Sequence, residues 1–333
     1  MAKQIGIDLG TSTTQIYLQG KGIVMRAPSV IALEKASRRV IAVGSAAKRM
    51  LGKTPTSILA FRPVKDGVIA DFDITSLMLN QFFQKVEAGS MLSRPSVVIC
   101  VPYGITEVER RAVEDASYEA GARSVSLIEE PIAAAIGTGL KVAGARGNMI
   151  VDIGGGTTEV AVISLGGIVA SNTLRVAGDA FDAAIVSYMK VRHSVLIGEA
   201  TAELLKMRIG SAHPRYDRGE LQVWGRSLRN GLAACITVQS GEIREAITEQ
   251  LELIAASVKA ALEETPPELS ADIFDTGIML TGGCSLIPGL PQLLEDSTGI
   301  RVRLSKHPFD SVCMGIGRCV ETSDSSEFIR KRR

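Results

Sequence analysis

The chain has 333 residues, of which 46% are hydrophobic and 22% are charged, and this composition is typical of a folded protein with two domains. Its 37 Lys and Arg residues nearly balance its 36 Asp and Glu residues. Because nucleic-acid binding usually requires a basic excess, we expect no DNA or RNA partner.

The five cysteines are scattered, with no pair and no histidine at the spacing of a metal site, which favours reduced thiols. The first residues lack the charged and apolar regions of a secretory signal. No apolar run reaches the ~18 residues of a membrane-spanning helix, because Asp152 and Glu159 interrupt the most apolar stretch. We therefore expect a cytoplasmic protein whose contact with a membrane is peripheral.

In the first half of the chain, apolar runs predict strands at 4–9, 14–19, 23–25 and 29–33. A further strand is expected at 97–102. The amphipathic helix after it begins at an N-cap Thr106 and ends at Gly121. The next strand covers 124–130, and Pro131 then opens a helix at the position where proline is best tolerated.

The second half repeats this order. Strands are expected at 149–153, 159–164 and 167–175. A mostly helical insertion follows at about 181–243, and a helix runs from Gly241 to Glu264. Residues 278–290 are expected to form a strand, a glycine turn and a helix. This alternation of strands and helices predicts an α/β protein.

The two halves open with the same motif, IGIDLGTSTTQIYL at 5–18 and VDIGGGTTEVAVI at 151–163. The matching positions are Asp8 with Asp152, Gly10 with Gly154, Thr13 and Thr14 with Thr157 and Thr158, and Ile16 with Val160. Glycine weakens a strand, so such a cluster marks a bend or a place where something approaches the backbone. The matched copies predict an internal duplication.

A strand that ends in Asp, followed by glycines and hydroxyl side chains, exposes backbone N–H groups that can hold phosphate oxygens. Two such turns can bind one polyphosphate from both sides. Asp8 and Asp152 would then face each other and hold Mg²⁺ mainly through its waters, since that ion dehydrates reluctantly. A single glycine turn is most often only a turn, but two matched copies favour phosphate binding.

Two other phosphate motifs do not fit. GGGTTE at 154–159 is followed by a predicted strand instead of a helix, so the dinucleotide-binding fingerprint lacks its context. LGKTP at 51–55 is similar to the end of a P-loop, but Ala47 stands where the first glycine belongs, and no apolar strand precedes it.

The paired turns resemble those of the superfamily of actin, sugar kinases and heat-shock chaperone ATPases, and within it the chain resembles the MreB family of bacterial actins. Nearly the whole chain takes part. The further segments that carry the resemblance are RPVKDGVIADFDIT (62–75), CVPYGITEVERRAVEDASYEAGAR (100–123), LIEEPIAAAIG (127–137), LIGEATAELLKMRIGSAHP (196–214) and LTGGCSLIPGL (280–290).

The resemblance implies an actin-like ATPase fold, with two duplicated α/β lobes, a smaller subdomain on each, and a nucleotide in the cleft between the lobes. Subdomain IA is expected at 1–33, 66–144 and 310–333, and subdomain IB at 34–65. Subdomain IIA is expected at 145–180 and 244–309, and subdomain IIB at 181–243.

The resemblance also implies roles for single residues around the phosphates. The expected phosphate contacts are Gly10, Thr11, Ser12 and Thr13 in the first turn and Gly154, Gly155, Gly156 and Thr157 in the second. Glu130, the second glutamate of the EEP motif, would position or activate the water that attacks the γ-phosphate, with help from Thr157. Two alternatives remain. The carboxylate of Glu130 could serve only to stabilise the N-terminus of its helix, or Glu129, which has the same chemistry, could act on the water instead.

The nucleoside side of the expected site follows from the same resemblance. The residues are Gly178, Glu203, Lys206, Gly282 and Gly283. Glu203 and Lys206 lie on one helix face, so a surface ion pair is the alternative. Cys284 stands where the family usually has a third glycine, and Thr13 replaces a customary asparagine. Both departures bear on nucleotide affinity and hydrolysis rate.

Membrane contact is expected at two apolar residues of a polar loop, Met91 and Leu92, since loops at this position insert into lipid in some relatives. The alternative is that both side chains pack on the adjacent helix. The four basic residues from Arg330 to Arg333 predict a solvated tail that could assist contact with anionic lipid.

The resemblance implies a cytoskeletal protein that binds ATP and Mg²⁺, hydrolyses ATP slowly and assembles into paired, membrane-associated protofilaments. Its expected roles are cell shape and cell-wall elongation, and its expected partners are its own copies, the inner face of the cytoplasmic membrane and wall-elongation proteins. The alternatives are two other functions of the superfamily, a small-molecule kinase and a chaperone-like ATPase. The kinase would also need an acceptor pocket and a base, and the chaperone would need a substrate-binding domain.

Overall fold

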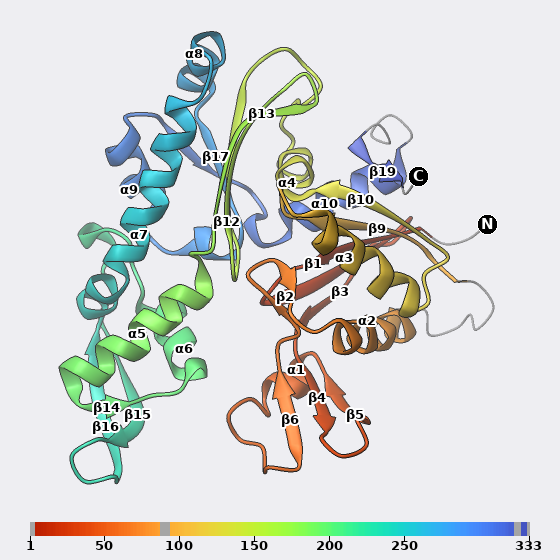
Figure 1. The fold of residues 1–333 in the computed structure, drawn as a ribbon. Helices are drawn as coiled ribbons and strands as arrows, with labels where there is room; N and C mark the ends of the chain where they lie inside the picture. The colour runs from red at the N-terminus through yellow and green to blue at the C-terminus, as the bar shows by residue number, and fades with distance from the viewer. Residues whose placement is uncertain (1–3, 87–93, 323–327, 332–333) are drawn as a thin grey trace. The chain divides into compact units, whose positions relative to one another are not determined.

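The computed structural model describes residues 4–86, 94–322 and 328–331, and the chain divides into two units (Figure 1). Unit 1 comprises Met1–Arg146, Ile163–Ile168 and Phe309–Arg333. Unit 2 comprises Gly147–Val162 and Val169–Pro308. Each unit contains one large sheet with its own buried apolar core.

The large sheet of unit 1 has six strands in the order β19-β10-β9-β1-β2-β3. They are β1 Gln4–Leu9, β2 Thr13–Leu18, β3 Gly22–Pro28, β9 Ser96–Val101, β10 Ser124–Glu129 and β19 Arg330–Lys331. Strands β1, β2 and β3 are antiparallel, whereas β9 and β10 run parallel to β1. The predicted strands 4–9, 14–19, 97–102 and 124–130 are confirmed to within one residue.

Alternating side chains divide this sheet between two layers of helices. Ile5 and Ile7 belong to the core that α2 (Phe72–Val86) and α3 (Glu107–Glu119) share. Gly6 lies between them and faces α10 (Ser311–Glu321), because a Cβ there would be 2.7 Å from Ile316. Helix α4 (Glu130–Thr138) packs on α10. Successive residues of a central strand therefore face α2 and α3, then α4 and α10.

Local sequence signals account for the starts of α3 and α4. Thr106 caps α3 as predicted: its Oγ1 accepts from the N–H of Glu109 (3.2 Å), whose carboxylate accepts from the N–H of Thr106 (2.8 Å). Pro131 lies in the first turn of α4, one residue after its start. Gly139 ends α4 in the left-handed conformation at φ 86°.

Helices α4 and α10 cross at two glycines. A Cβ on Gly137 would overlap the carbonyl oxygen of Ser311, and a Cβ on Gly315 would overlap that of Ala133. Close approach of the two backbones, and not an unusual φ, therefore requires glycine at both positions. This crossing fixes where α4 lies in unit 1.

Unit 1 also contains smaller elements. A three-stranded sheet consists of β5 (Val40–Val43), β4 (Ile31–Glu34) and β6 (Ile58–Phe61), and α1 (Ser45–Lys48) packs near it. Strands β7 (Val64–Lys65) and β8 (Val68–Ile69) form a hairpin, and the 3-10 helix η3 (Pro308–Asp310) begins at the last residue of unit 2 and continues into unit 1. Most of the small sheet lies inside the predicted insertion at 34–65.

The large sheet of unit 2 has the order β13-β12-β11-β17-β18. Its strands are β11 Asn148–Ile153, β12 Thr158–Ser164, β13 Gly167–Leu174, β17 Ile278–Thr281 and β18 Val302–Leu304. Strands β17 and β18 run parallel to β11, as β9 and β10 do to β1. The matching order, with β3-β2-β1-β9-β10 in unit 1, confirms the predicted duplication.

The helices of unit 2 bury one continuous apolar core with this sheet. They are α5 Gly178–His193, α6 Glu199–Ile209, α7 Ser240–Glu263, α8 Pro267–Thr276 and α9 Leu290–Thr298, with the 3-10 helices η1 Pro214–Tyr216 and η2 Gly283–Leu286. Helix α7 confirms the predicted helix at 241–264 to within one residue.

The prediction of a mostly helical insertion at 181–243 is wrong for its second half. Strands β15 (Glu220–Ser227) and β16 (Ala233–Gln239) form an antiparallel hairpin, and β14 (Val195–Leu196) completes a three-stranded sheet. Gly225 lies within β15 and interrupts its apolar pattern. Glycine is required there because a Cβ would be 2.7 Å from the carbonyl oxygen of Leu196. The close pairing with β14 that requires this glycine is not a local sequence signal.

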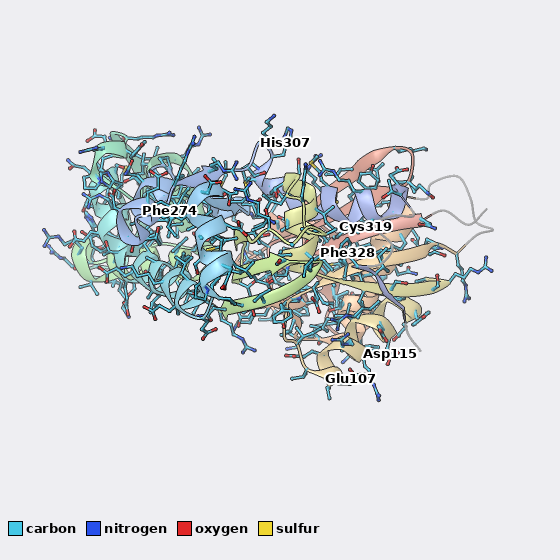
Figure 2. All side chains as sticks on the ribbon, turned by 90° about the horizontal axis from the view of Figure 1, so that it is seen from above. Glu107, Asp115, Phe274, His307, Cys319 and Phe328 are labelled. Carbon is cyan, nitrogen blue, oxygen red and sulfur yellow. The ribbon has the colours of Figure 1, made fainter. Side chains whose placement is uncertain are left out.

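The first two residues of the tail predicted at Arg330–Arg333 form a strand of the sheet, although the side chain of Arg330 is exposed. Phe328, which is labelled in Figure 2, packs on Gly166, where a Cβ would be 3.0 Å from Cε1 of the phenyl ring. Arg330 and Lys331 then pair with β10 as the antiparallel edge strand β19. An open sheet edge offers unpaired backbone groups, which a short extended segment satisfies whatever its charge. Residues 323–327 and 332–333 lie outside the described residues.

We expect Gly137→Ala to lower the free energy of unfolding by about 3 kcal/mol, because the added methyl overlaps a backbone carbonyl that cannot rotate away. Gly241→Ala in α7 is the matched control, since its Cβ would meet only side chains, at 3.5 Å or more. That change should stabilise by about 0.4–1 kcal/mol. Urea unfolding of both variants measures the difference, and equal effects would contradict the assigned crossing.

Candidate functional site

The first glycine turn, Gly10 to Thr13, joins β1 to β2 and is fixed by hydroxyl groups. Ser29 donates its Oγ hydrogen to the carbonyl oxygen of Gly10 (2.6 Å), and its Oγ is also 2.8 Å from Oγ1 of Thr14. The N–H of Gly67 donates to Oγ1 of Thr11 (2.9 Å). These contacts hold the backbone of the turn in one conformation.

Asp8 is the next-to-last residue of β1, beside this turn, and is partly buried. Burial, opposed by a hydrogen bond from Sγ of Cys100 (3.5 Å) and assisted by the charge of Asp310, raises the pKa of Asp8 to about 7. A carboxyl group with such a pKa is only partly ionised near neutral pH. A cation beside it would favour the ionised form.

Gln15, the cross-strand partner of Asp8, was not expected as a site residue. Its Nε2 donates to the carbonyl oxygen of Phe309 (2.6 Å), and its side chain is buried. Its Oε1 has no hydrogen-bond partner among the residues that the structure describes. A buried acceptor beside a carboxyl group fits the donors of a hydrated Mg²⁺ ion. Alternation in β2 was the available signal, since Gln15 is a polar residue between buried positions.

The second glycine turn, Gly154 to Thr157, joins β11 to β12 and is fixed by the start of α5. The N–H of Gly178 donates to the carbonyl oxygen of Gly154 (3.3 Å), and the N–H of Asp179 donates to that of Gly155 (2.8 Å). Thr157 and Asp152 are buried at the two ends of the turn. Gly156 lies between Gly155 and Thr157, so all four expected residues share one ordered turn.

Lys206 anchors the start of α5 from inside unit 2. Its Nζ donates to the carbonyl oxygen of Gly178 (2.9 Å) and lies 2.9 Å from Oδ1 of Asp182. Both charged side chains are only 9% exposed. The alternative of a surface ion pair with Glu203 is therefore wrong for Lys206, which is buried. Lys206 acts on the second turn through Gly178.

Asp182 is a second residue that sequence reasoning missed. Burial raises its pKa to about 6, although the charge and hydrogen bond of Lys206 oppose this shift. The available signal was an acidic residue inside the otherwise apolar stretch of α5. Its partner Lys206 lies in α6, so the pairing itself depends on the fold.

The third glycine segment lies after β17 in unit 2. Gly282 has a φ of 87°, and a Cβ there would overlap Oδ1 of Asp152. Gly283 begins η2, in which Cys284 is buried. Burial raises the pKa of Cys284 to about 11, so its thiol stays protonated and is a poor nucleophile at neutral pH.

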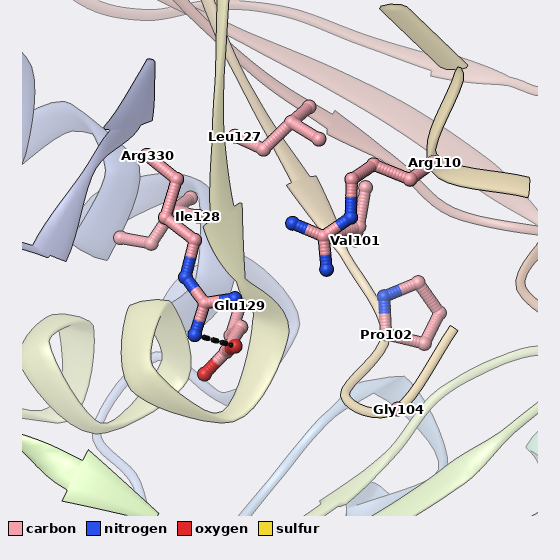
Figure 3. A pocket seen from close by; sticks show the side chains of 8 residues that line it. All are labelled: Val101, Pro102, Gly104, Arg110, Leu127, Ile128, Glu129 and Arg330. Carbon is pink, nitrogen blue, oxygen red and sulfur yellow. Dashed lines mark ion pairs between the residues drawn. The ribbon is translucent and has the colours of Figure 1, made fainter. Parts of the chain in front are cut away.

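Glu129 points into a small pocket on the α3 side of the sheet. Its Oε1 is 2.7 Å from Nη2 of Arg330 (Figure 3). The pocket is lined by Val101, Pro102, Gly104, Arg110, Leu127, Ile128, Glu129 and Arg330. Leu127, two residues earlier in β10, belongs to the core under α2 and α3. Strand alternation therefore puts Glu129 on that face as well.

Glu130 lies on the other side. The pKa of Cys100 is raised mainly by burial, then by the charges of Asp8 and Glu130. Cys100 donates to Asp8, and helix α4, which begins at Glu130, packs on α10, the helix that Gly6 faces two residues before Asp8 in β1. The two candidate glutamates thus have different surroundings, and only Glu130 is on the side of Asp8.

The predicted site residues fall into three groups: those in unit 1, those in unit 2, and those outside the described residues. The residues in unit 1 are Asp8, Gly10, Thr11, Ser12, Thr13 and Glu130, and those in unit 2 are Asp152, Gly154, Gly155, Gly156, Thr157, Gly178, Glu203, Lys206, Gly282 and Gly283. Met91 and Leu92 lie outside the described residues. In the described part of the chain, no helix is both long enough and apolar enough to cross a bilayer.

The chain matches the model of the MreB/Mbl protein family over residues 2–327. It is 50% identical to the cell shape-determining protein MreB of Escherichia coli, over 97% of this chain and 94% of that protein. It is 46% identical to the cell shape-determining protein Mbl of Bacillus subtilis, over 97% of each.

Solved structures of MreB5 from Spiroplasma citri superpose on the chain. The ADP-bound structure has a TM-score of 0.91 at 35% identity, over 96% of each chain. The AMPPNP-bound structure has a TM-score of 0.92 at 34% identity, over 98% of this chain and 97% of that one. These superpositions confirm the predicted actin-like α/β fold.

Replacing Lys206 with Met should lower the free energy of unfolding by about 3–5 kcal/mol, because Asp182 would be left buried without its cation. The double variant Asp182→Leu/Lys206→Met should recover most of this loss, since no buried charge remains unpaired. Urea unfolding at pH 7 measures both. Equal losses in the single and double variants would show that charge pairing is not the cause.

Asp182→Asn gives a pH control for the same pair. Because the pKa of Asp182 rises from 3.8 to about 6 on folding, the folded state binds more protons between about pH 4 and 6. Its contribution to stability therefore falls as pH rises through that window. Relative to Asp182→Asn, the unchanged protein should lose stability between pH 4 and pH 7.

Proposed function

The chain belongs to the MreB/Mbl family, and from this premise we propose that it is an ATP-binding cytoskeletal protein that assembles into filaments and directs cell shape. The proposal is carried by the pair of matched glycine turns. Each turn is held by hydrogen bonds and follows a strand that contains an aspartate. The ADP and AMPPNP named for the Spiroplasma citri relative support a nucleotide as the ligand.

Each turn has the chemistry to bind phosphate oxygens through backbone N–H groups and threonine or serine hydroxyls. In the first turn these residues are Gly10 to Thr13, and in the second they are Gly154 to Thr157. We assign the adenosine to Glu203, Lys206, Gly282 and Gly283, with Gly178 beside the second turn. Because Lys206 already contacts Gly178, part of its role is to hold that turn in place.

The oxygen donors beside the two turns fit Mg²⁺. Asp8, Asp152 and Oε1 of Gln15 would hold it, mainly through its waters. The ion, when bound, neutralises phosphate charge. Burial raises the pKa of Asp8 to about 7, and a bound cation would favour its ionised form.

We assign the slow hydrolysis of ATP to Glu130, which would accept a proton from the attacking water, with Thr157 assisting. Its position on the side of Asp8, unlike that of Glu129, supports this choice. We propose that hydrolysis weakens the filament, so the ATPase acts as a clock for a protein that is primarily structural.

Assembly requires a contact that repeats without closing on itself, and paired protofilaments are the proposed form. We place the protein in the cytoplasm, peripheral at the inner face of the cytoplasmic membrane, with Met91 and Leu92 as the lipid contact. Two such side chains supply only a few kcal/mol, roughly, so stable binding requires many subunits acting together. Cell-wall elongation proteins are the proposed further partners.

Electron microscopy on anionic liposomes tests the function. We expect paired filaments on lipid with ATP and Mg²⁺, and none without nucleotide. The variant Met91→Ser/Leu92→Ser should keep filaments in solution and lose them from lipid. ATP binding without filaments under any condition would contradict the proposal and favour the kinase alternative, for which acceptor-dependent ADP release is the next measurement.

Glu130→Ala should leave ATP binding intact and slow phosphate release by at least about 100-fold, because the attacking water loses its base. Glu199→Ala is the matched control, since Glu199 also lies in the first turn of a helix but is exposed at the start of α6. Its turnover should equal that of the unchanged protein. Normal turnover in Glu130→Ala would remove the catalytic assignment.

A further inference from the structure

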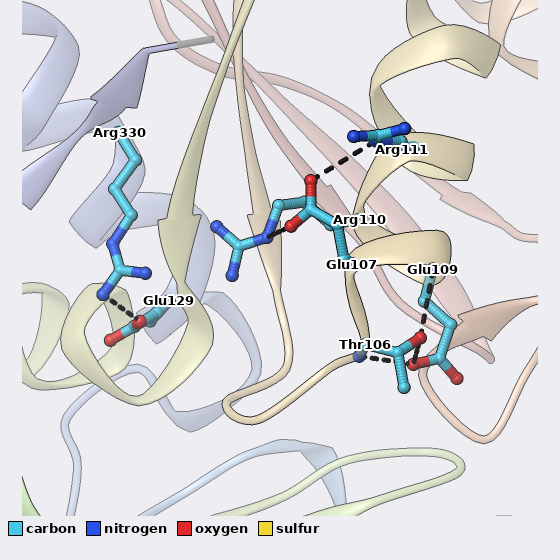
Figure 4. Close-up of polar contacts among 7 residues, drawn as sticks. All are labelled: Thr106, Glu107, Glu109, Arg110, Arg111, Glu129 and Arg330. Carbon is cyan, nitrogen blue, oxygen red and sulfur yellow. Dashed lines mark hydrogen bonds and ion pairs between the residues drawn. The ribbon is translucent and has the colours of Figure 1, made fainter. Parts of the chain in front are cut away.

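The C-terminal strand β19 is held in unit 1 by three separate contacts. Its backbone extends the sheet, with Arg330 opposite Leu127 in β10. The ring of Phe328 packs on Gly166, two residues before the strand begins. The guanidinium of Arg330 pairs with Glu129, at the end of β10 (Figure 4). Main chain, ring and charge together define one docked position for this segment.

Glu129, the partner of Arg330, is next in sequence to the proposed base Glu130. Glu129 is the N-cap residue of α4 but makes no capping hydrogen bond, and Glu130 follows it as the first helical residue. Both carboxylates are attracted to the positive end of the same helix. Strand alternation directs the Cβ of Glu129 toward the α3 face, but its carboxylate can still turn back to the start of α4, where it would compete with that of Glu130 and repel it.

The surroundings of the pocket keep the pair on the α3 side. Arg110 lines the same pocket, and its Nε is 3.6 Å from Glu107, so that arginine already has an acidic partner (Figure 4). The side chain of Glu129 is only 19% exposed, whereas that of Arg330 is 61% exposed. Arg330 therefore supplies the matching charge from the solvent side.

We propose that Arg330 is a positioning residue for hydrolysis: by pairing with Glu129, it holds that carboxylate on the α3 face and leaves Glu130 alone to act on the water. The inference rests on the proposed function, because it takes Glu130 as the base. The C-terminal strand thereby acts on turnover through β10, without contacting nucleotide. Anything that lifts β19 from β10 would slow hydrolysis and prolong the ATP state.

An exposed ion pair of this kind adds little to folding stability, so the effect should appear in rate and not in unfolding. Arg330→Ala should lower kcat by about tenfold with KM unchanged, the scale expected when a catalytic group is slightly misplaced. Arg330→Lys should retain most of the rate because it keeps the charge. Single-turnover ATP hydrolysis, with the pelleted fraction measured alongside, gives these values.

The decisive variant is Glu129→Gln in the Arg330→Ala background. Removing the competing carboxylate should restore turnover, which a merely structural strand would not do. Arg39→Ala is the matched control, since Arg39 forms another exposed ion pair of unit 1, with Glu34 at 3.6 Å. It should change neither kcat nor KM.

The outcomes separate this inference from the proposed function. If Glu130→Ala is slow while Arg330→Ala is normal, the function stands and the role of Arg330 is wrong. The same holds if Arg330→Ala is slow but Glu129→Gln does not restore it. In the Glu130→Ala background, Arg330→Ala should have no further effect, and an additive loss would overturn the inference.

Discussion

The arrangement of unit 1 depends on the close contact between the backbones of α4 and α10. Only glycine at 137 and 315 lets the two helices approach until each carbonyl fills the space of a missing methyl. Because α4 begins at Glu130 and follows β10 directly, this contact also fixes where the proposed base starts. A larger residue would move the helix and with it the carboxylate, so packing and chemistry share one constraint.

The glycine turns of the two duplicated halves are held in place by different contacts. Both turns need a rigid backbone, but the first is braced by the hydroxyl of Ser29 and the N–H of Gly67, and the second by the first residues of α5. The second brace requires a buried cation, Lys206, and hence a buried anion, Asp182. Such a pair seldom adds net stability, so its retention is better explained by the unique position it gives α5.

Sequence alone could predict what depends on neighbours along the chain. The strands of both large sheets, the capped start of α3 and the two glycine turns are local patterns. The resemblance then supplied the fold that the superpositions confirm. What the sequence could not predict was long-range. Asp182 pairs with Lys206 of another helix, and β19 pairs with β10, which lies far from it in the sequence. Neither partner can be deduced from spacing.

One departure from the family pattern, Cys284, lies at a position where the backbone does not require glycine. Gly282 needs its glycine, because its φ is 87° and Asp152 and Ile153 leave no room for a Cβ. Cys284 lies in η2 with an ordinary φ, so glycine is not required there by the backbone. Its sulfur instead lies against Gly178, where a Cβ would be only 3.0 Å away. A side chain at Gly178 would also meet the carbonyl oxygens of Gly155 and Gly154, at 3.3 and 3.4 Å, so the thiol and the second turn together leave little room there.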